Sequence, residues 1–590
     1  MQKLWRGGAT ALRSVRQRRG AALVLGAVMM VMLFAFVAFA IDIGFISLTR
    51  AQLQNNADAA ALAAAQELSG VDDPATVRTN ARKAAYDVVV ANVGGNANNA
   101  NFDPAQDVVF GKLSWNSGTQ SYSYQWGDQY TPYNVVKVFA RRQLRPPAPG
   151  SQAVLDQRLP LFFAPVIGES KASLETNAIA NFQPRDIMVV LDFSHSMCYD
   201  SQFYRLDLLG RASIETSLQQ IWEDLGSPKY GKMAFTPDYV KYSGVAASGT
   251  IPHIDLTWKG TSVDVTSTSN ITKVRLQFSN GNTQTINGSA KTGNFKGSSS
   301  NAGKEITAAW VLSNGNANVS SGGYGEKFDF SNTGIIAALG LSNVTYPYPA
   351  GSWTEFVDYV TGGSADITNA GYQFQFGMML WVNYLQDYRG AANETPDLWK
   401  TREQPTAILK QGVNLFVDYL TSMEADDQVG LSVYSLGNST GAKLELGLSK
   451  NLTQVKTVTQ QRQAGHYDPY TNIGAGMKLA RLELESNSRP RAHRLMVVMT
   501  DGMVNRPTNA STGTALVLSE ASKAAASKIR ILTISMGIMA DADLMQQVAD
   551  ATGGQHYHVP GGADFAVYQQ QLLNAFREIA ASRPLKLIGQ

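Results

Sequence analysis

The stretch of sequence that decides the fold is Asp186-Ile-Met-Val-Val-Leu-Asp-Phe-Ser-His-Ser196. Residues 187–191 form an uninterrupted apolar run with β-branched side chains, which is typical of a strand buried on both faces of a parallel sheet. Three oxygen-bearing side chains, Asp192, Ser194 and Ser196, follow directly. Because ligands of such sheets bind just beyond the carboxyl ends of the strands, this loop is a candidate binding site.

A carboxylate followed by two hydroxyls offers only oxygen donors. Hard divalent cations prefer such donors, so the loop suits Mg²⁺, with Mn²⁺ or Ca²⁺ as alternatives. The pattern is weak by itself, because a strand followed by a serine-rich turn has the same composition. Two later segments strengthen it. Thr471 stands just before an amphipathic helix, and a second buried-strand run, residues 495–499, is followed by Thr500 and Asp501.

These three segments, in this order, resemble the metal-ion-dependent adhesion site of the von Willebrand factor A (VWA) domain. The resemblance implies an α/β fold: a doubly wound, mostly parallel sheet with helices on both faces. It also implies that one divalent cation is held jointly by Asp192, Ser194, Ser196, Thr471 and Asp501. In this family an open coordination position accepts an acidic side chain from a protein partner.

The rest of the VWA pattern resumes only after a long interruption. Residues 405–423 carry a helical apolar stripe and are expected to form the first VWA helix. The domain is therefore predicted to comprise residues 184–197 and 404–582, with an insertion at 198–403 that leaves from the metal loop. Residues 443–446 are expected to form an antiparallel edge strand.

The insertion divides into two parts by composition. At about 250–330 the chain is rich in Thr, Ser, Asn and Gly, and residues 271–278 alternate with the period of a half-buried strand, which predicts a small β-sandwich. At about 350–400 aromatic residues accumulate, and helices are expected at 352–360 and 376–388. We expect these aromatics to form a core; the alternative is a recognition surface for glycan or protein beside the metal.

The formal charge of +3 comes from the N-terminus. Residues 1–20 hold six basic residues and no acid, so the remainder carries 44 basic against 47 acidic side chains. No basic patch with interleaved aromatics is visible, which argues against a nucleic-acid partner. Cys198 is the only cysteine, so an internal disulfide framework is excluded. Hard cations prefer oxygen, and we therefore expect Cys198 to be a packing residue.

Residues 21–41 contain no charged or strongly polar side chain. About twenty helical residues cross a hydrocarbon core of about 30 Å, so this segment is predicted to be a transmembrane helix. The positive-inside rule places the tail at 1–20 in the cytoplasm and the bulk of the chain in the periplasm or outside the cell. A cleaved signal peptide is the alternative, because Ala38-Phe39-Ala40 resembles a signal-peptidase site. Residues 42–70 are expected to continue the helix.

The apolar span, Ile41-Asp42-Ile43-Gly44 and the run from Gln54 to Leu62 together resemble the N-terminal segment of the TadE/TadG-like proteins. Those proteins serve the tight-adherence (Flp-type) pilus assembly systems of bacteria, so the resemblance implies an inner-membrane location and other pilus assembly components as partners. Cleavage by prepilin peptidase after Gly20 is not predicted, because Leu25 stands where pilin-like members carry Glu. The TadG-like type with a VWA domain fits better.

Residues 71–183 are expected to form a small pilin-like α+β region. Asp73 and Pro74 predict the start of a helix that runs to about residue 90. Strands are expected at 107–113, 133–140 and 174–182.

The sequence thus predicts a membrane-anchored, extracytoplasmic, metal-dependent binding protein of a pilus or surface adhesion system. A structural pilus component with an idle metal site is the main alternative, and release to the cell surface stays open. We do not expect an enzyme or catalytic residues. An aspartate-nucleophile phosphotransferase would need a second carboxylate where Ser194 stands and further acid after Asp501.

Overall fold

A computed structural model describes residues 19–68, 73–92, 102–116, 118–145, 155–244, 253–313, 327–423, 426–436, 441–490, 492–537, 539–560 and 565–588. The chain forms two compact units. The first comprises Met1–Gln183, Met423–Ala425 and Pro584–Gln590, and the second comprises Pro184–Ser422 and Asp426–Arg583. The fold class is α/β, as the sequence predicted.

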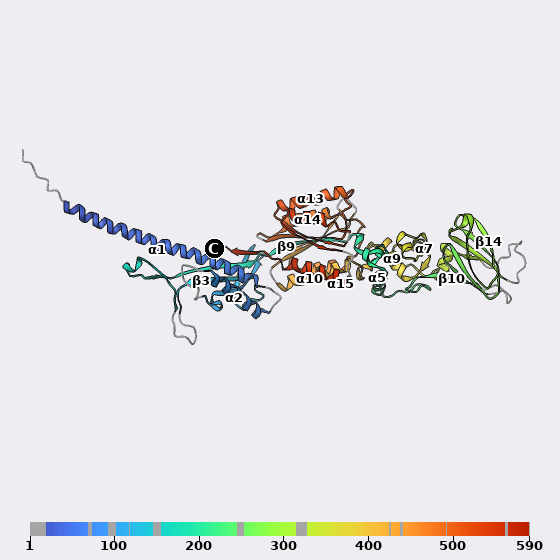
Figure 1. Cartoon of the computed structure of the whole chain (residues 1–590), viewed down its shortest axis with the longest axis horizontal. Coiled ribbons are helices and arrows are strands. Elements are labelled where there is room, and N and C mark those ends of the chain that lie inside the picture. Colours follow the sequence, from blue (N-terminus) through green and yellow to red (C-terminus); the bar gives the residue numbers. More distant parts are fainter. Residues whose placement is uncertain are drawn as a thin grey trace, which may run out of the picture. The chain divides into compact units, whose positions relative to one another are not determined.

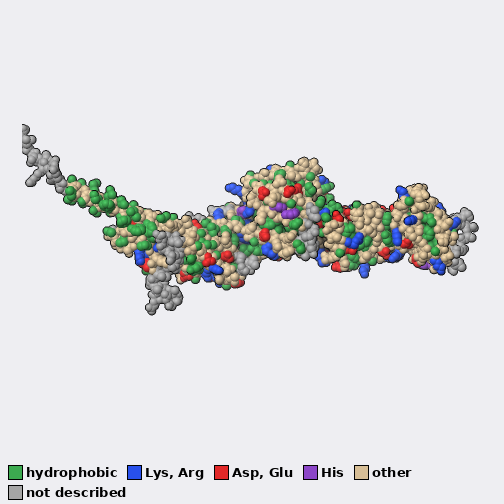
Figure 2. Space-filling model, viewed as in Figure 1, with side chains coloured by type: hydrophobic (Ala, Val, Ile, Leu, Met, Phe, Trp, Pro, Cys, Tyr) green, Lys and Arg blue, Asp and Glu red, His purple; other side chains and the backbone are tan. Residues whose placement is uncertain are grey.

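The first unit begins with one continuous helix, α1 (Arg19–Gln66), which joins the predicted transmembrane segment and its extension. Its apolar N-terminal half is exposed, and Figure 2 shows hydrophobic side chains covering it. Among the described residues, α1 is the one helix long and apolar enough to cross a membrane. From Leu53 onward its small side chains, among them Ala57 and Ala61, are buried against the rest of this unit.

The remainder of the first unit is a five-stranded antiparallel sheet beside helix α2 (Pro74–Ala91), whose N-terminus is capped by Asp73. Short elements accompany it: α3 (Pro104–Asp107), β4 (Leu144–Arg145), β5 (Leu155–Asp156), β6 (Leu159–Pro160), the 3-10 helix η1 (Ala164–Ile167) and β7 (Lys171–Ala172). The strand order is β2-β1-β3-β8-β24, with β1 Val108–Asn116, β2 Ser121–Trp126, β3 Val135–Arg142, β8 Leu174–Phe182 and β24 Leu585–Ile588. The sequence analysis missed β2 and β24.

The second unit contains a six-stranded sheet in which every strand pairs in parallel except one. Its order is β20-β19-β9-β21-β22-β23, with β9 Arg185–Asp192, β19 Gln428–Tyr434, β20 Lys443–Ser449, β21 His493–Thr500, β22 Arg530–Met536 and β23 Gln555–Val559. The antiparallel strand is β20, at the edge, as predicted. Strand β23 was not predicted.

Helices cover both faces of this sheet (Figure 1). One face packs on α10 (Thr406–Met423), α11 (Thr453–Gln460) and α15 (Phe565–Ala581), and the other on α12 (Ile473–Asn487), α13 (Ala510–Ala526) and α14 (Ala542–Ala551). Along β9, Ile187, Val189 and Leu191 enter the first core, while Met188 and Val190 enter the second. This double burial is why the strand has no polar alternation.

The insertion begins as two 3-10 helices, η2 (His195–Ser201) and η3 (Phe203–Arg205), and two α-helices, α4 (Leu206–Leu209) and α5 (Arg211–Asp224). Two antiparallel sheets then pack apolar side chains such as Trp258 and Leu276 into one core. Their orders are β15-β12-β11-β10-β18 and β14-β13-β16-β17, with β10 Asp238–Gly244, β11 Ile254–Trp258, β12 Ser262–Ser267, β13 Ile271–Phe278, β14 Thr283–Asn287, β15 Thr292–Lys296, β16 Ile306–Ser313, β17 Lys327–Asp329 and β18 Gln375–Phe376. The same core takes in α6 (Asn332–Ala338), α7 (Trp353–Gly362), α8 (Ala365–Asn369) and α9 (Met378–Tyr388).

A buried ionic cluster fixes the start of β9. Asp427 accepts a hydrogen bond from Arg185 Nη2 at 2.9 Å and another from Arg583 Nη2 at 2.8 Å. All three side chains are almost completely excluded from solvent. The cluster therefore joins the first strand of the sheet to the chain that follows the last helix.

Asp427→Ala should destabilise the second unit by about 3–5 kcal/mol, because it removes the carboxylate that two buried guanidiniums share. Asp238→Ala is the matched control, since its pair with Lys241 is solvent-exposed and such pairs contribute little. Thermal unfolding of the full-length protein in detergent, followed by circular dichroism, measures both. Equal midpoints for the two variants would contradict this account of the cluster.

Candidate metal centre

The predicted site residues stand where three elements of the VWA sheet begin or end. Strand β9 ends at Asp192, β21 ends immediately before Asp501, and Thr471 precedes α12. Strands β9 and β21 are parallel neighbours. Their carboxyl ends therefore reach the same edge of the sheet, where parallel sheets bind ligands.

Three of the predicted side chains are joined by hydrogen bonds. Ser196 Oγ donates to Asp501 Oδ1 at 2.6 Å, across 305 positions of sequence. Ser194 Oγ and Ser196 Oγ lie 3.0 Å apart. The loop after β9 and the residue after β21 thus form one cluster.

Thr471 belongs to the same cluster. Its backbone N–H donates to Asn505 Oδ1 at 3.0 Å, and its carbonyl accepts from the Asn505 N–H at 3.1 Å, which ties it to the loop after β21. A Cβ atom placed on Gly502 would lie 3.3 Å from Ser196 Oγ and 3.8 Å from Thr471 Oγ1. Both hydroxyls therefore approach Gly502, and a side chain at that position would crowd them.

The carboxylate of Asp192 is completely buried and held from both sides. Its Oδ1 accepts from the Ser194 N–H at 2.8 Å, and its Oδ2 accepts from Thr500 Oγ1 at 2.9 Å. Tyr434, opposite Asp192 in the register of β19 and β9, donates its hydroxyl to the Met499 carbonyl. The sequence analysis assigned no role to Thr500 or Tyr434. Their positions at the carboxyl ends of neighbouring strands were the available signal.

The charged forms of Asp192 and Asp501 are disfavoured in this cluster, because both carboxylates are buried. Burial and the negative charge of Asp192 raise the pKa of Asp501 well above its usual value. Burial also raises the pKa of Asp192, although hydrogen bonds from Ser194 and Thr500 oppose the shift. A bound cation would favour the charged forms of both groups.

The donor set determines which cation could bind. Among the described residues there is no group of three or more His, Cys, Asp and Glu side chains that could hold a metal ion. The candidate centre instead combines two carboxylates with three hydroxyls. Such a set suits a hard cation and is poor for zinc or copper.

Two residues beside the cluster, His195 and Cys198, have packing contacts that indicate a structural role. The Cys198 thiol is buried, donates to the His195 carbonyl at 3.1 Å, and has its pKa raised by burial. The ring of His195 packs on Tyr199 with centroids 5.4 Å apart, and burial lowers its pKa. Neither residue adds a charged ligand to the cluster.

The insertion leaves and returns at the metal loop. The Thr406 hydroxyl donates to the Met197 carbonyl at 2.7 Å, and the Gln404 N–H donates to Ser201 Oγ at 2.7 Å. The Gly465 N–H donates to the Phe193 carbonyl at 2.8 Å, and Gln463 Nε2 reaches the Gly390 carbonyl at 2.6 Å. The first three bonds hold residues 193–201 in place, and the fourth ties the segment that carries Gly465 to the insertion.

The aromatic cluster of the insertion is mainly core. The side chains of Trp353, Phe356, Trp381 and Tyr384 are buried, whereas Tyr388 is 58% exposed. The described aromatics therefore favour packing over the recognition surface that was the alternative.

The fold and the site define a VWA-type domain, and the family comparison agrees: residues 399–572 match the von Willebrand factor type A domain. Residues 20–67 match the Flp pilus-assembly TadE/G-like family. The chain therefore joins a TadE/G-like segment to a VWA domain, as the sequence predicted. No match was found among curated proteins.

Solved structures give weaker likenesses. An aerotolerance-related membrane protein from Bacteroides fragilis is 17% identical over 30% of this chain and 90% of its own, with a TM-score of 0.24. The pilus adhesin SpaC from Lactobacillus rhamnosus GG, in its open conformation, is 15% identical over 30% of this chain and 28% of its own, with a TM-score of 0.24. The PilB minor pilin from Streptococcus sanguinis is 12% identical over 63% of this chain and 97% of its own, with a TM-score of 0.25. These values carry no argument about function.

A pH-dependent stability is expected from Asp387, at the end of α9. Burial raises its pKa to about 6, and the Tyr359 hydroxyl donates to Oδ2 at 3.3 Å. The raised pKa stabilises the fold at pH values below about 3.9, its value in an unfolded chain, and this contribution is lost as the pH rises through about 6.

Asp387→Asn, which stays neutral, should gain stability over the wild type between pH 4 and pH 7, by about 2–3 kcal/mol at most. Thermal unfolding of the two full-length proteins across this range tests it. Asp358→Asn, at an exposed carboxylate of α7, is the matched control. A constant difference between Asp387→Asn and wild type at all pH values would refute the assignment.

Proposed function

We propose that this chain is a membrane-anchored VWA protein of a Flp-type pilus assembly or surface adhesion system, and that it binds a protein partner through a divalent cation. The observation that carries the proposal is the bond from Ser196 to Asp501, which brings the two halves of the oxygen cluster together. The TadE/G-like segment at residues 20–67 supports the pilus context.

In this proposal Ser194, Ser196 and Thr471 ligate the cation directly or through water, while Asp192 and Asp501 supply negative charge and orientation. Mg²⁺ is the preferred ion, with Mn²⁺ or Ca²⁺ as alternatives. Two carboxylates leave the ion short of anionic ligands, so an open position can accept an acidic side chain from the partner. The role is binding rather than catalysis, since Ser194 occupies the place where a phosphotransferase would need a second acid.

The membrane arrangement follows from the N-terminal charges. We place residues 1–20 in the cytoplasm, α1 across the bacterial inner membrane, and the two folded units on the periplasmic or extracellular side. Other pilus assembly components are the expected partners.

A second candidate is a structural pilus component with an idle metal site. It is favoured by the hydrogen bond from Ser196 to Asp501, which gives each of these two side chains a partner within the protein. A glycan-binding role for the β-sandwich is a weaker candidate, because the neighbouring aromatic side chains are largely buried.

Isothermal titration calorimetry of the full-length protein in detergent should detect binding of Mg²⁺ or Mn²⁺. Asp192→Ala should abolish it, and Ser196→Ala should weaken it, because each removes an oxygen from the cluster or its support. Asp543→Ala, at an exposed carboxylate of α14, is the matched control. Equal heats for wild type and Asp192→Ala would remove the metal from the proposal.

Piliation distinguishes the two candidates. Deletion of the gene should abolish pilus assembly or adherence under either. Asp192→Ala should reproduce that loss if metal-dependent binding is the function, provided that immunoblotting shows normal protein levels. Wild-type piliation and adherence in the Asp192→Ala strain would favour the idle-site candidate.

A further inference from the structure

A hairpin of the first unit presents an apolar tip beside α1. Strands β6 and β7 form its base, and residues 161–170 connect them. We call the apolar part of this connection, residues 161–167, the tip segment; Gly168, Glu169 and Ser170 lead back to β7. The tip segment reads Leu-Phe-Phe-Ala-Pro-Val-Ile and has no charged or polar side chain. Phe162 is 66% exposed and Val166 is 88% exposed. Such a concentration of exposed apolar side chains marks an interaction surface.

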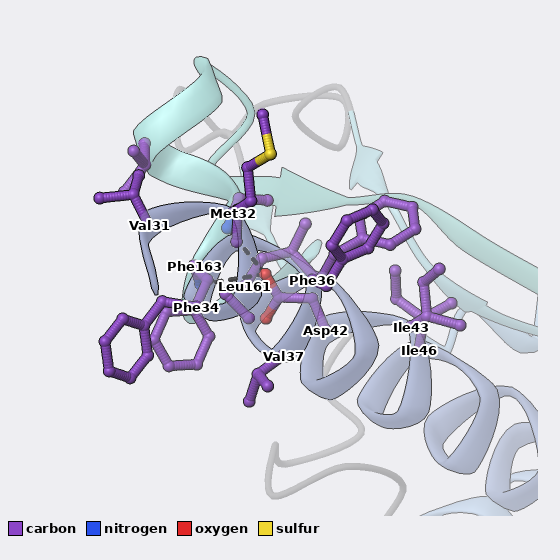
Figure 3. Close-up of a pocket in the computed structure, with 15 residues that line it drawn as sticks. Val31, Met32, Phe34, Phe36, Val37, Asp42, Ile43, Ile46, Leu161 and Phe163 are labelled. Atoms are coloured by element: carbon purple, nitrogen blue, oxygen red, sulfur yellow. Dashed lines mark hydrogen bonds between the residues drawn. The ribbon is translucent and has the colours of Figure 1, made fainter. Parts of the chain in front are cut away.

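The tip segment is fastened to α1 by Asp42. The carboxylate of Asp42 is buried and accepts the backbone N–H groups of Phe162, Phe163 and Ala164 at 2.8, 3.0 and 2.7 Å. The ring of Phe162 also packs on Phe45, with centroids 5.2 Å apart. Figure 3 shows the Asp42 carboxylate reaching the tip segment from the helix.

A groove of about 860 Å³ lies between the two elements. Its walls are apolar side chains of α1, such as Val31 and Phe36, and of the tip segment, such as Leu161 and Phe163 (Figure 3). The α1 wall extends from Val31 to Ile46 and includes the C-terminal half of the predicted transmembrane span. At 1.5 Å per residue, Val31 lies about 16 Å along the helix from Asp42.

We propose that the tip segment is a second membrane contact, which enters the leaflet nearest Asp42 and packs its apolar side chains among the lipid acyl chains beside α1. Lipid is the expected occupant because residues of α1 that line the groove, such as Val31 and Phe36, must lie in hydrocarbon if α1 spans the membrane.

The backbone of the tip segment supports this placement. In hydrocarbon an unpaired N–H costs several kcal/mol. Asp42 satisfies three of these groups, Pro165 has none, and the N–H groups of Leu161 and Val166 donate to the carbonyls of Ser170 and Phe163. The segment can therefore leave water without exposing these donors.

The base of the hairpin is charged, as a membrane interface requires. Asp156 pairs with Arg158 at 3.0 Å and with Lys171 at 2.7 Å. Long basic side chains at such a level reach the headgroups while their stems cover apolar surface. The apolar tip and charged base together match a hairpin that enters one leaflet and does not cross the bilayer.

Site-directed spin labelling of the full-length chain tests the proposal. Cys198 is the single cysteine and is buried, so a Cys198→Ala background can carry one new label at a time. Labels at Val166→Cys in the tip segment, Val31→Cys in α1 and Val90→Cys on the exposed face of α2 are compared in vesicles of phosphatidylethanolamine and phosphatidylglycerol. Collision rates with oxygen and with a neutral nickel chelate report depth.

We expect Val166→Cys to resemble Val31→Cys, with an oxygen-to-nickel ratio several-fold above that of Val90→Cys. A lipid-like ratio at residue 31 with a water-like ratio at residue 166 overturns the proposal and makes a partner helix the occupant of the groove. Water-like ratios at both positions overturn the proposal and the membrane anchor together.

Asp42→Ala tests whether the Asp42 carboxylate holds the tip segment against α1. It should shift residue 166 toward water while residue 31 stays in lipid, because three backbone N–H groups lose their acceptor. Asp42→Asn, which keeps one acceptor oxygen, should shift it less. An unchanged ratio at residue 166 in Asp42→Ala overturns the role given to Asp42.

Discussion

The candidate site depends on the parallel pairing of β9 with β21, in which Ile187 is aligned with Leu495. This register sets the heights at which Asp192 and Asp501 leave the sheet, and the Ser196 hydroxyl then joins the loop that follows Asp192 to Asp501. The long insertion between β9 and α10 does not disturb the pairing, because the entropy of closing a loop grows only slowly with its length. The bonds from Thr406 and Gln404 to the chain after the metal loop close the insertion at its root.

Patterns within a segment predicted most of the fold. The apolar runs 187–191 and 495–499 identified the two central strands, and the stripe over 405–423 identified α10. Strands β2, β23 and β24 were missed because each is short and mostly half-buried or exposed, so none contains the long apolar run that identified the central strands. Strand β2 does alternate polar and aromatic side chains, and this signal was overlooked. Strand β24 also pairs with β8, some 400 residues earlier, and a partner so distant leaves no local signal.

The candidate site was predictable only in part, because some of its contacts join residues that are far apart in the sequence. The family pattern supplied the five oxygen-bearing residues, and the structure brings all five to one edge of the sheet. It could not supply Thr500 or Tyr434, because their contact with the surroundings of Asp192 depends on the register of three strands. The tip segment escaped notice since its apolar residues show neither helical nor strand periodicity, and their exposure becomes visible only in three dimensions.

Two buried aspartates show how the same side chain serves different ends. Asp42 accepts three backbone N–H groups, so its charge is matched by fixed protein dipoles and it needs no further ligand. Asp501 accepts one serine hydroxyl, and burial together with the charge of Asp192 raises its pKa. The first arrangement is complete without an ion and suits a fastening between segments. In the second arrangement burial and a neighbouring carboxylate disfavour the anion, and this is the physical reason why we propose a cation there.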